Sequence, residues 1–142
     1  MIFEEANRIW VGSNQFGASL IDTETLEVHS ASKVNPWGVS LDIRALHDIA
    51  VISGNYWLAT NEGLIVLASN GRILKRIQSN DLGVKEEINA LSISVVDKDI
   101  WVGTYIGLFL LSDATERTIS SDFHPDFLHL NADTYSATGI PS

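Results

Sequence analysis

The sequence predicts an all-β protein made of three four-stranded antiparallel units, and three observations support this prediction. A similar segment occurs three times, short β-rich runs are separated by frequent turn residues, and one run in each of the later two copies is continuously apolar. No segment keeps a 3.6-residue apolar period over ten or more residues, which argues against helices. The chain of 142 residues is therefore predicted to form a single repeat-based domain over residues 1–142.

The repeat is recognised from Trp10, Trp57 and Trp101, which begin the similar tetrapeptides WVGS, WLAT and WVGT. A second anchor lies upstream, where NPWGVSLDIRAL from Asn35 aligns without gaps to NDLGVKEEINAL from Asn80. Two anchors in the same order predict that one structural unit occurs three times. Because the tryptophans are equivalent, we interpret them as packing residues.

The first copy covers about residues 1–32. Its residues 2–6 supply only part of a first strand, because the chain starts close to the first tryptophan. The segment NRIWVGSNQFGASLID then carries two strands joined by a turn.

The second copy covers about residues 41–78. Its strands are predicted at residues 43–52, 56–60, 64–68 and 73–78. The tripeptides SGN and SNG supply turns between them.

The third copy covers about residues 86–122. Its strands are predicted at residues 88–96, 100–105, 108–112 and 117–121. The tail, residues 123–142, is expected to supply an inner strand to a neighbouring unit, with residues 133–138 at the matching position.

The third strands of the later copies, LIVL at 64–67 and LFLL at 108–111, are apolar without alternation. Both faces of such a strand must be buried, as they are in a sheet stacked between two others. Four-stranded repeats of about 40–50 residues are typical of a β-propeller, which closes with four to eight blades. Three blades make a partial propeller, so we expect closure by oligomerisation, as a homodimer with six blades.

The pattern I-x-x-L followed by (I/Y)-W-(V/L)-(G/A)-T-x-x-G-L, best seen at residues 88–91 and 100–108, resembles the two-component regulator propeller repeat. The resemblance implies a sensor domain of the kind that precedes a membrane span and a histidine kinase or a diguanylate cyclase. It also implies a periplasmic or extracellular location if the chain is excised from such a sensor. If Met1 is the native start, we expect a cytoplasmic protein.

In propellers, the loops between blades and those between second and third strands share one face. A ligand or partner is expected there, since these loops carry amide, acidic and aromatic side chains. The candidate residues are Gln15, Phe16, Asn35, Trp37, Asn61, Glu62, Asn80, Asp81, Tyr105 and Ile106.

The expected function is non-catalytic binding of a small molecule or a protein, as in a sensor input domain. A self-assembling scaffold or protein-interaction module is the alternative. A propeller lyase or hydrolase comes third, with Asp42 and Glu87 near inner-strand starts as its acids.

A net charge of −9 argues against nucleic-acid and anionic-membrane partners. The sequence has no cysteine, which excludes disulfides and zinc–thiolate sites. His124 and His129, with Asp126 and Asp133, match no known metal-ligand spacing. We therefore expect neither a metal nor another cofactor.

Overall fold

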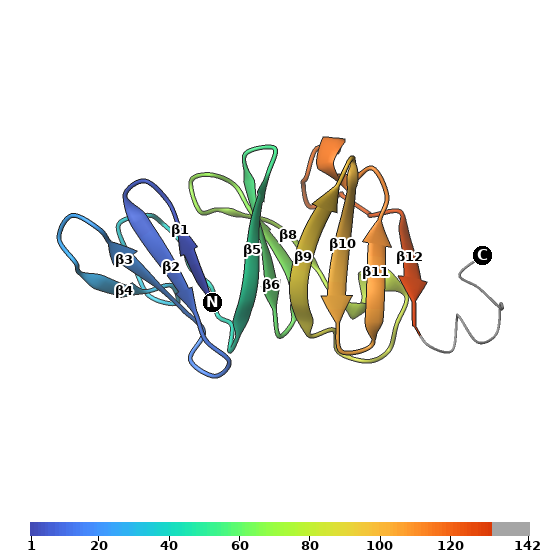
Figure 1. The fold of residues 1–142 in the computed structure, drawn as a ribbon, viewed down its shortest axis with the longest axis horizontal. Coiled ribbons are helices and arrows are strands. Elements are labelled where there is room, and N and C mark those ends of the chain that lie inside the picture. The colour runs from blue at the N-terminus through green and yellow to red at the C-terminus, as the bar shows by residue number, and fades with distance from the viewer. Residues whose placement is uncertain (132–142) are drawn as a thin grey trace.

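A computed structural model describes residues 1–131, which form three four-stranded antiparallel sheets standing side by side in a row (Figure 1). We call them the first, second and third sheets in chain order. Within each sheet, strands that follow one another in the sequence are also neighbours. The predicted all-β class and the three four-stranded units are confirmed, and the arrangement is consistent with propeller-like blades.

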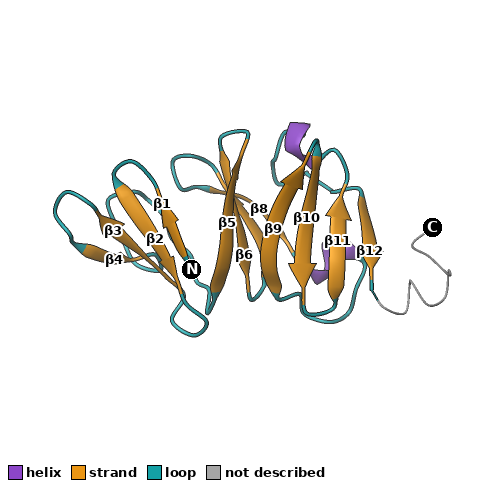
Figure 2. Cartoon of the chain, viewed as in Figure 1, coloured by secondary structure: helices purple, strands orange, loops and turns teal. Residues whose placement is uncertain are grey.

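The strands are short and regular. The first sheet contains β1 (Ile2–Glu4), β2 (Arg8–Gly12), β3 (Ala18–Asp22) and β4 (Val28–Ser30). The second contains β5 (Leu46–Ile52), β6 (Asn55–Thr60), β7 (Gly63–Leu67) and β8 (Ile73–Ile77). The third contains β9 (Ala90–Val96), β10 (Asp99–Thr104), β11 (Gly107–Leu111) and β12 (Phe127–Leu130). Two 3₁₀ turns, η1 (Ser79–Leu82) and η2 (Ala114–Glu116), lie outside the sheets (Figure 2).

The three tryptophans occupy the same place in their sheets. The register pairs Trp10 with Leu20, Trp57 with Val66, and Trp101 with Leu110. We call the face of each sheet that carries its tryptophan the front face, and the opposite face the back face. The sequence repeat is therefore also a repeat of strand register.

The sheets pack front face to back face, and each contact between sheets has its own core. At the first junction, Trp10 and Leu20 of the first sheet cluster with Leu58, Ile65 and Leu67 of the second. The tightly packed side chains of this core exclude water, which is the main source of stability in such a stack.

The second junction is built from the equivalent positions. Trp57 and Val66 of the second sheet cluster with Ile100, Val102 and Phe109 of the third. Both junctions bury their tryptophans almost completely, at 0% exposure for the first-sheet indole and 1% for the second-sheet indole.

Strand β7 is buried along its whole length, as the unbroken run of apolar residues predicts. Strand β11 has the same kind of sequence, but only Phe109 and Leu111 are buried, while Leu108 and Leu110 are half-buried. The reason is that, within residues 1–131, no sheet covers the front face of the third sheet. The prediction that both faces of this strand are buried is therefore not met within the described chain.

The fourth strand of the third sheet lies at Phe127–Leu130, and the prediction of a strand at 117–121 is wrong. The segment between β11 and β12 instead sends Ile119 and Phe123 into the core of the second junction, at 7% and 3% exposure. The Phe123 ring meets Trp57 edge to face at 6.4 Å. Burial of these two side chains outweighs the ladder hydrogen bonds that a strand at 117–121 would form.

The expected role of the tail is corrected in part by the same observation. Its residues 127–130 pair with β11 and form the outer edge of their own sheet, rather than an inner strand of a neighbour. Residues 133–138, where that inner strand was predicted, lie outside the described residues. In the described part of the chain, no helix is long and apolar enough to cross a membrane.

Candidate functional site

The turns β2–β3, β6–β7 and β10–β11 all lie at the same end of the three sheets, which we call the lower end (Figure 1). The turns β5–β6, β7–β8 and β9–β10 lie at the other, upper end. Eight of the ten predicted residues belong to the lower end: Gln15, Phe16, Asn61, Glu62, Asn80, Asp81, Tyr105 and Ile106. The last strand of the second sheet also finishes there, since Gly63 lies against the carbonyl of Ile77.

Asn61 is a structural residue. Its side-chain oxygen accepts hydrogen bonds from the backbone N–H groups of Arg44 (3.1 Å) and Ala45 (3.0 Å), and it is only 8% exposed. These bonds fix the chain where it enters β5. The Asn61 amide therefore ties the connection between the first and second sheets to the β6–β7 turn instead of facing solvent.

The Asp81 carboxylate also makes contacts within the protein. It accepts a hydrogen bond from the backbone N–H of Gln78 at 2.9 Å and lies 3.6 Å from the Lys75 ammonium group. Both contacts hold the η1 turn beside β8.

Phe16 and Tyr105 are highly exposed, at 87% and 71%, and Gln15 is exposed as well. They occupy turns of the first and third sheets, with the second sheet between them. These aromatic side chains are therefore available at the lower end but belong to separate parts of it.

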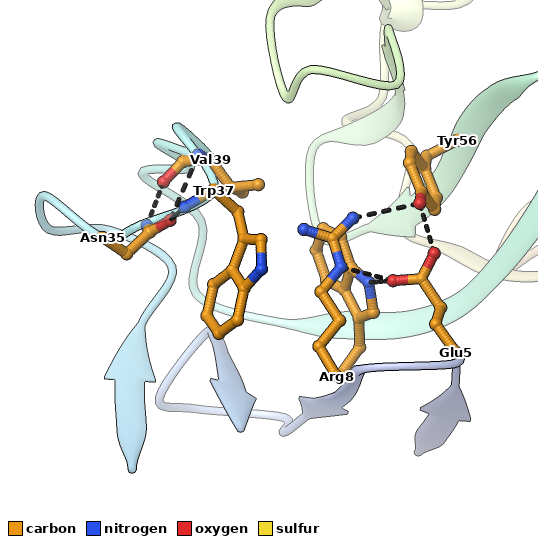
Figure 3. A network of polar contacts seen from close by, with 7 residues as sticks. Glu5, Arg8, Asn35, Trp37, Val39 and Tyr56 are labelled. Atoms are coloured by element: carbon orange, nitrogen blue, oxygen red, sulfur yellow. Dashed lines mark hydrogen bonds and ion pairs between the residues drawn. The ribbon is translucent and has the colours of Figure 1, made fainter. Parts of the chain in front are cut away.

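Asn35 and Trp37 lie elsewhere. A Cβ atom added to Gly71, in the upper β7–β8 turn, would lie 2.9 Å from the Trp37 carbonyl oxygen, and the Trp37 ring lies 5.7 Å from the Arg8 guanidinium, where β2 begins. The Asn35 side chain accepts hydrogen bonds from the Trp37 and Val39 N–H groups and thereby shapes this loop (Figure 3). The structure does not bring Trp37 to the lower end with the other predicted residues.

At the upper end of the first junction lies a group of side chains that we call the Arg8 cluster: Glu5, Arg8, Trp10 and Tyr56. Figure 3 shows Glu5, Arg8 and Tyr56 of this cluster. Glu5 accepts hydrogen bonds from the Arg8 Nε, from the Tyr56 hydroxyl, and from the Trp10 indole at 3.0 Å. Arg8 also donates to the Tyr56 oxygen at 3.0 Å. Its guanidinium carbon lies 5.2 Å from the Trp10 ring and 5.5 Å from the Tyr56 ring.

The contacts within the Arg8 cluster change the pKa values of Glu5 and Tyr56. Burial alone would raise the pKa of Glu5, but hydrogen bonds from Tyr56, Arg8 and Trp10 outweigh it and hold that pKa below its ordinary value. Burial, together with the hydrogen bond donated to Glu5, raises the pKa of Tyr56. With all its charges paired, this cluster joins two sheets and leaves little capacity for a ligand.

A hollow of about 230 Å³ opens at the lower end, where the connection between the second and third sheets passes the β6–β7 turn. Its lining residues are Glu62, Gln78, Ser79, Asn80, Glu87 and Ile88. Thr60 fixes the turn that presents Glu62, because its hydroxyl oxygen accepts the Glu62 N–H at 3.1 Å and its hydroxyl donates to the Gly63 carbonyl at 2.9 Å.

The chemistry of the hollow is acidic and amidic. Glu62 and Glu87 line it, and Glu62 forms a half-exposed ion pair with Arg76 at 3.9 Å. Of the predicted residues, Glu62 and Asn80 line the hollow together, and Glu87, considered as an acid for a propeller enzyme, lines it too. Sequence reasoning missed Gln78 and Ser79, since only the folded turn brings them beside the other four.

Among the described residues, no group of three or more His, Cys, Asp or Glu side chains is placed to hold a metal ion. His129 stacks on Phe109 at 4.2 Å, and its Nε2 lies 2.7 Å from the Ile106 carbonyl oxygen. Asp126 pairs with Arg117 at 3.9 Å, and Asp133 lies outside the described residues. No protein-family model matches the chain, and no curated protein matches it.

Proposed function

We propose that the chain is a non-catalytic binding module, resembling the input domain of a sensor, that holds a small ligand carrying a positive charge. The observation behind this proposal is the hollow at the lower end, where Glu62 and Glu87 approach from two different segments. A net charge of −9 favours the approach of a cation over that of an anion. The volume, about 230 Å³, suits a ligand smaller than a typical drug.

The amide groups of Gln78 and Asn80 add hydrogen-bonding capacity beside the two carboxylates. A primary ammonium group can donate three hydrogen bonds, which carboxylate and amide oxygens among the lining residues can accept. We therefore expect a short amine or diamine to bind better than an uncharged molecule of the same length.

The test compares 1,4-diaminobutane with 1,4-butanediol, which has the same length and no charge. The diamine is expected to raise the unfolding temperature of the protein progressively as its concentration increases, and the diol is not. The double variant Glu62→Gln/Glu87→Gln is expected to lose this response.

The matched control is Glu24→Gln/Asp122→Asn, which removes the same charge at two exposed positions outside the hollow. It should keep the response, because only the local carboxylates are required. An equal response to the diol, or an undiminished response in the Glu62/Glu87 variant, contradicts the proposal.

A further inference from the structure

Two sheet faces at the ends of the row are rich in apolar side chains and uncovered within the described chain, and the first-sheet face also carries Glu4, opposite Ile9. The front face of the third sheet presents Trp101, Leu108, Leu110, Leu128 and Leu130, which are half-buried or exposed. The back face of the first sheet presents Ile2, Ile9, Val11, Ile21 and Val28, which are likewise half-buried or exposed. Contiguous apolar surface of this kind marks an interaction site.

These two faces are equivalent to the two faces that pack together at each internal junction. Leu108 and Leu110 occupy the β11 positions that match Ala18 and Leu20 of β3, which are buried in the first junction. The back face of the first sheet carries Ile9 at the position that matches Tyr56 and Ile100. A front face is thus left without a back face at one end of the row, and a back face without a front face at the other.

The two internal junctions also give the register of the missing contact. In the first junction, Trp10 meets Tyr56, the residue before the next tryptophan, at 5.7 Å between ring centroids. In the second junction, Trp57 shares its core with Ile100, which holds the same position before Trp101. A third contact of the same kind brings Trp101 against an isoleucine at the position of Ile9.

We infer that a second copy of this chain covers both open faces, with its first sheet packed on the third sheet of the first copy and the reverse at the other end. Each contact is head to tail, and two identical contacts close a ring of six sheets. Six lies within the four to eight sheets at which such rings close. This surface is separate from the lower-end hollow, so the inference stands apart from the proposed ligand.

The mass in solution tests the inference. Light scattering coupled to size exclusion is expected to give twice the 15.6 kDa mass of the chain at low micromolar concentration and above. Because each copy carries −9, raising the salt from about 0.05 M to about 0.5 M should strengthen the dimer.

Substitutions on the two open faces test its geometry. Trp101→Glu and Ile9→Glu are each expected to weaken dimerisation about 30-fold or more, although they lie on opposite ends of the row. Leu26→Glu is the control. It too replaces an apolar side chain by a carboxylate, but at an exposed position in the β3–β4 turn, outside the two open faces, so dimerisation should be unchanged. Circular dichroism of each variant verifies that the sheets are still formed.

Cross-linking keeps the inference testable if either glutamate variant fails to fold. The chain has no cysteine, so an Ile9→Cys/Trp101→Cys variant can form disulfides only through the introduced pair. Oxidation should give a covalent dimer with this double variant and not with either single cysteine. A monomer at every concentration up to about 100 micromolar overturns the inference, as do an open-ended polymer and a dimer that Trp101→Cys alone cross-links.

Discussion

At the upper end of the first junction, Glu5, Arg8 and Tyr56 form a partly buried polar cluster. The equivalent positions at the second junction carry, in the same order, Ile52, Asn55 and Ile100. Both isoleucines are buried in an apolar core with the tryptophan of the second sheet. The strand pairing around the tryptophan is the same in the first and second sheets, Trp10 opposite Leu20 and Trp57 opposite Val66.

The comparison shows that a repeated backbone contact tolerates opposite side-chain chemistry at one place. The apolar version gains stability from each buried group separately. The polar version is stable only when all its members are present together, because a buried charge without a partner costs several kcal/mol. The first junction is therefore the more specific of the two and the more sensitive to a single loss.

The largest effect is expected from the tryptophans that both junctions share. Trp57→Ala should lower the free energy of unfolding by about 4 kcal/mol, since it leaves a large cavity. Trp10→Ala should cost at least as much, because it also removes a hydrogen-bond donor to Glu5. Urea unfolding measures both, and a clearly smaller loss for Trp10→Ala would break the comparison.

A somewhat smaller effect is expected at the centre of the polar cluster. Arg8→Met should lower the free energy of unfolding by about 3 kcal/mol, since it leaves the Glu5 carboxylate without its cation. Installing the residues of the second junction, as Glu5→Ile/Arg8→Asn/Tyr56→Ile, should recover much of this loss despite three substitutions. If this triple variant is less stable than Arg8→Met in the same urea experiment, the two junctions are not interchangeable.

Tyr56→Phe should cost about 1–2 kcal/mol, because it removes one hydroxyl from the cluster and keeps the ring between the sheets. Ile100→Val, at the equivalent position, deletes one buried methylene and should cost about 1 kcal/mol. Thermal unfolding of the two variants compares a polar with an apolar loss. A Tyr56→Phe protein as stable as the wild type would mean that the hydroxyl contributes nothing.

The smallest effect is a dependence of stability on pH that arises from Glu5 and Tyr56 of the first junction. The pKa of Glu5 in the folded protein lies below its ordinary value of 4.5. Its contribution is therefore present above pH 4.5 and is lost as the pH falls through the lowered value. The pKa of Tyr56 is raised above 10.0, so its contribution is lost as the pH rises through the raised value.

Urea unfolding of the wild type and of the triple variant between about pH 3 and pH 6 measures the acidic limb. The stability of the wild type relative to the triple variant should fall on acidification. A constant difference would show that Glu5 is not favoured in its ionised form.

Much of the fold follows from the sequence because the repeat is visible at two anchors. The strands of the second sheet are predicted to within a few residues, and the burial of residues 64–67 is predicted from their unbroken apolar character. Such features depend on neighbours in the sequence, which is where pattern reasoning is strongest.

The errors arise where long-range packing decides. Residues 117–121 have strand-like composition, but Ile119 is buried in the second junction. The apolar-rich FLHL segment at 127–130 forms the edge of the sheet instead. Trp37 is predicted to lie with the other candidate residues, because the loops between the blades of a propeller generally share one face. Its loop instead turns toward Arg8 and Gly71, contacts that no local pattern announces.

The candidate site was predictable only in part for the same reason. Glu62 and Asn80 were found from their loops, while Gln78 and Ser79 join them through the course of the chain after β8. The Arg8 cluster was missed altogether. One feature of the sequence could have indicated it. Glu5 and Arg8, close to Trp10, are charged, whereas the second copy of the repeat carries Ile52 and Asn55 at the matching positions.

Each sheet is made only from strands adjacent in the sequence, and this has a consequence for how the protein folds. Contacts within a sheet are local, so each sheet can form with little loss of loop entropy, and folding should be fast for an all-β chain. Among the described residues, only the second sheet has both faces covered by sheets of the same chain, so in the monomeric protein it should be the last to open. Amide hydrogen exchange should be slowest in β6 and β7, and equal protection in β2 or β10 would contradict this order of opening.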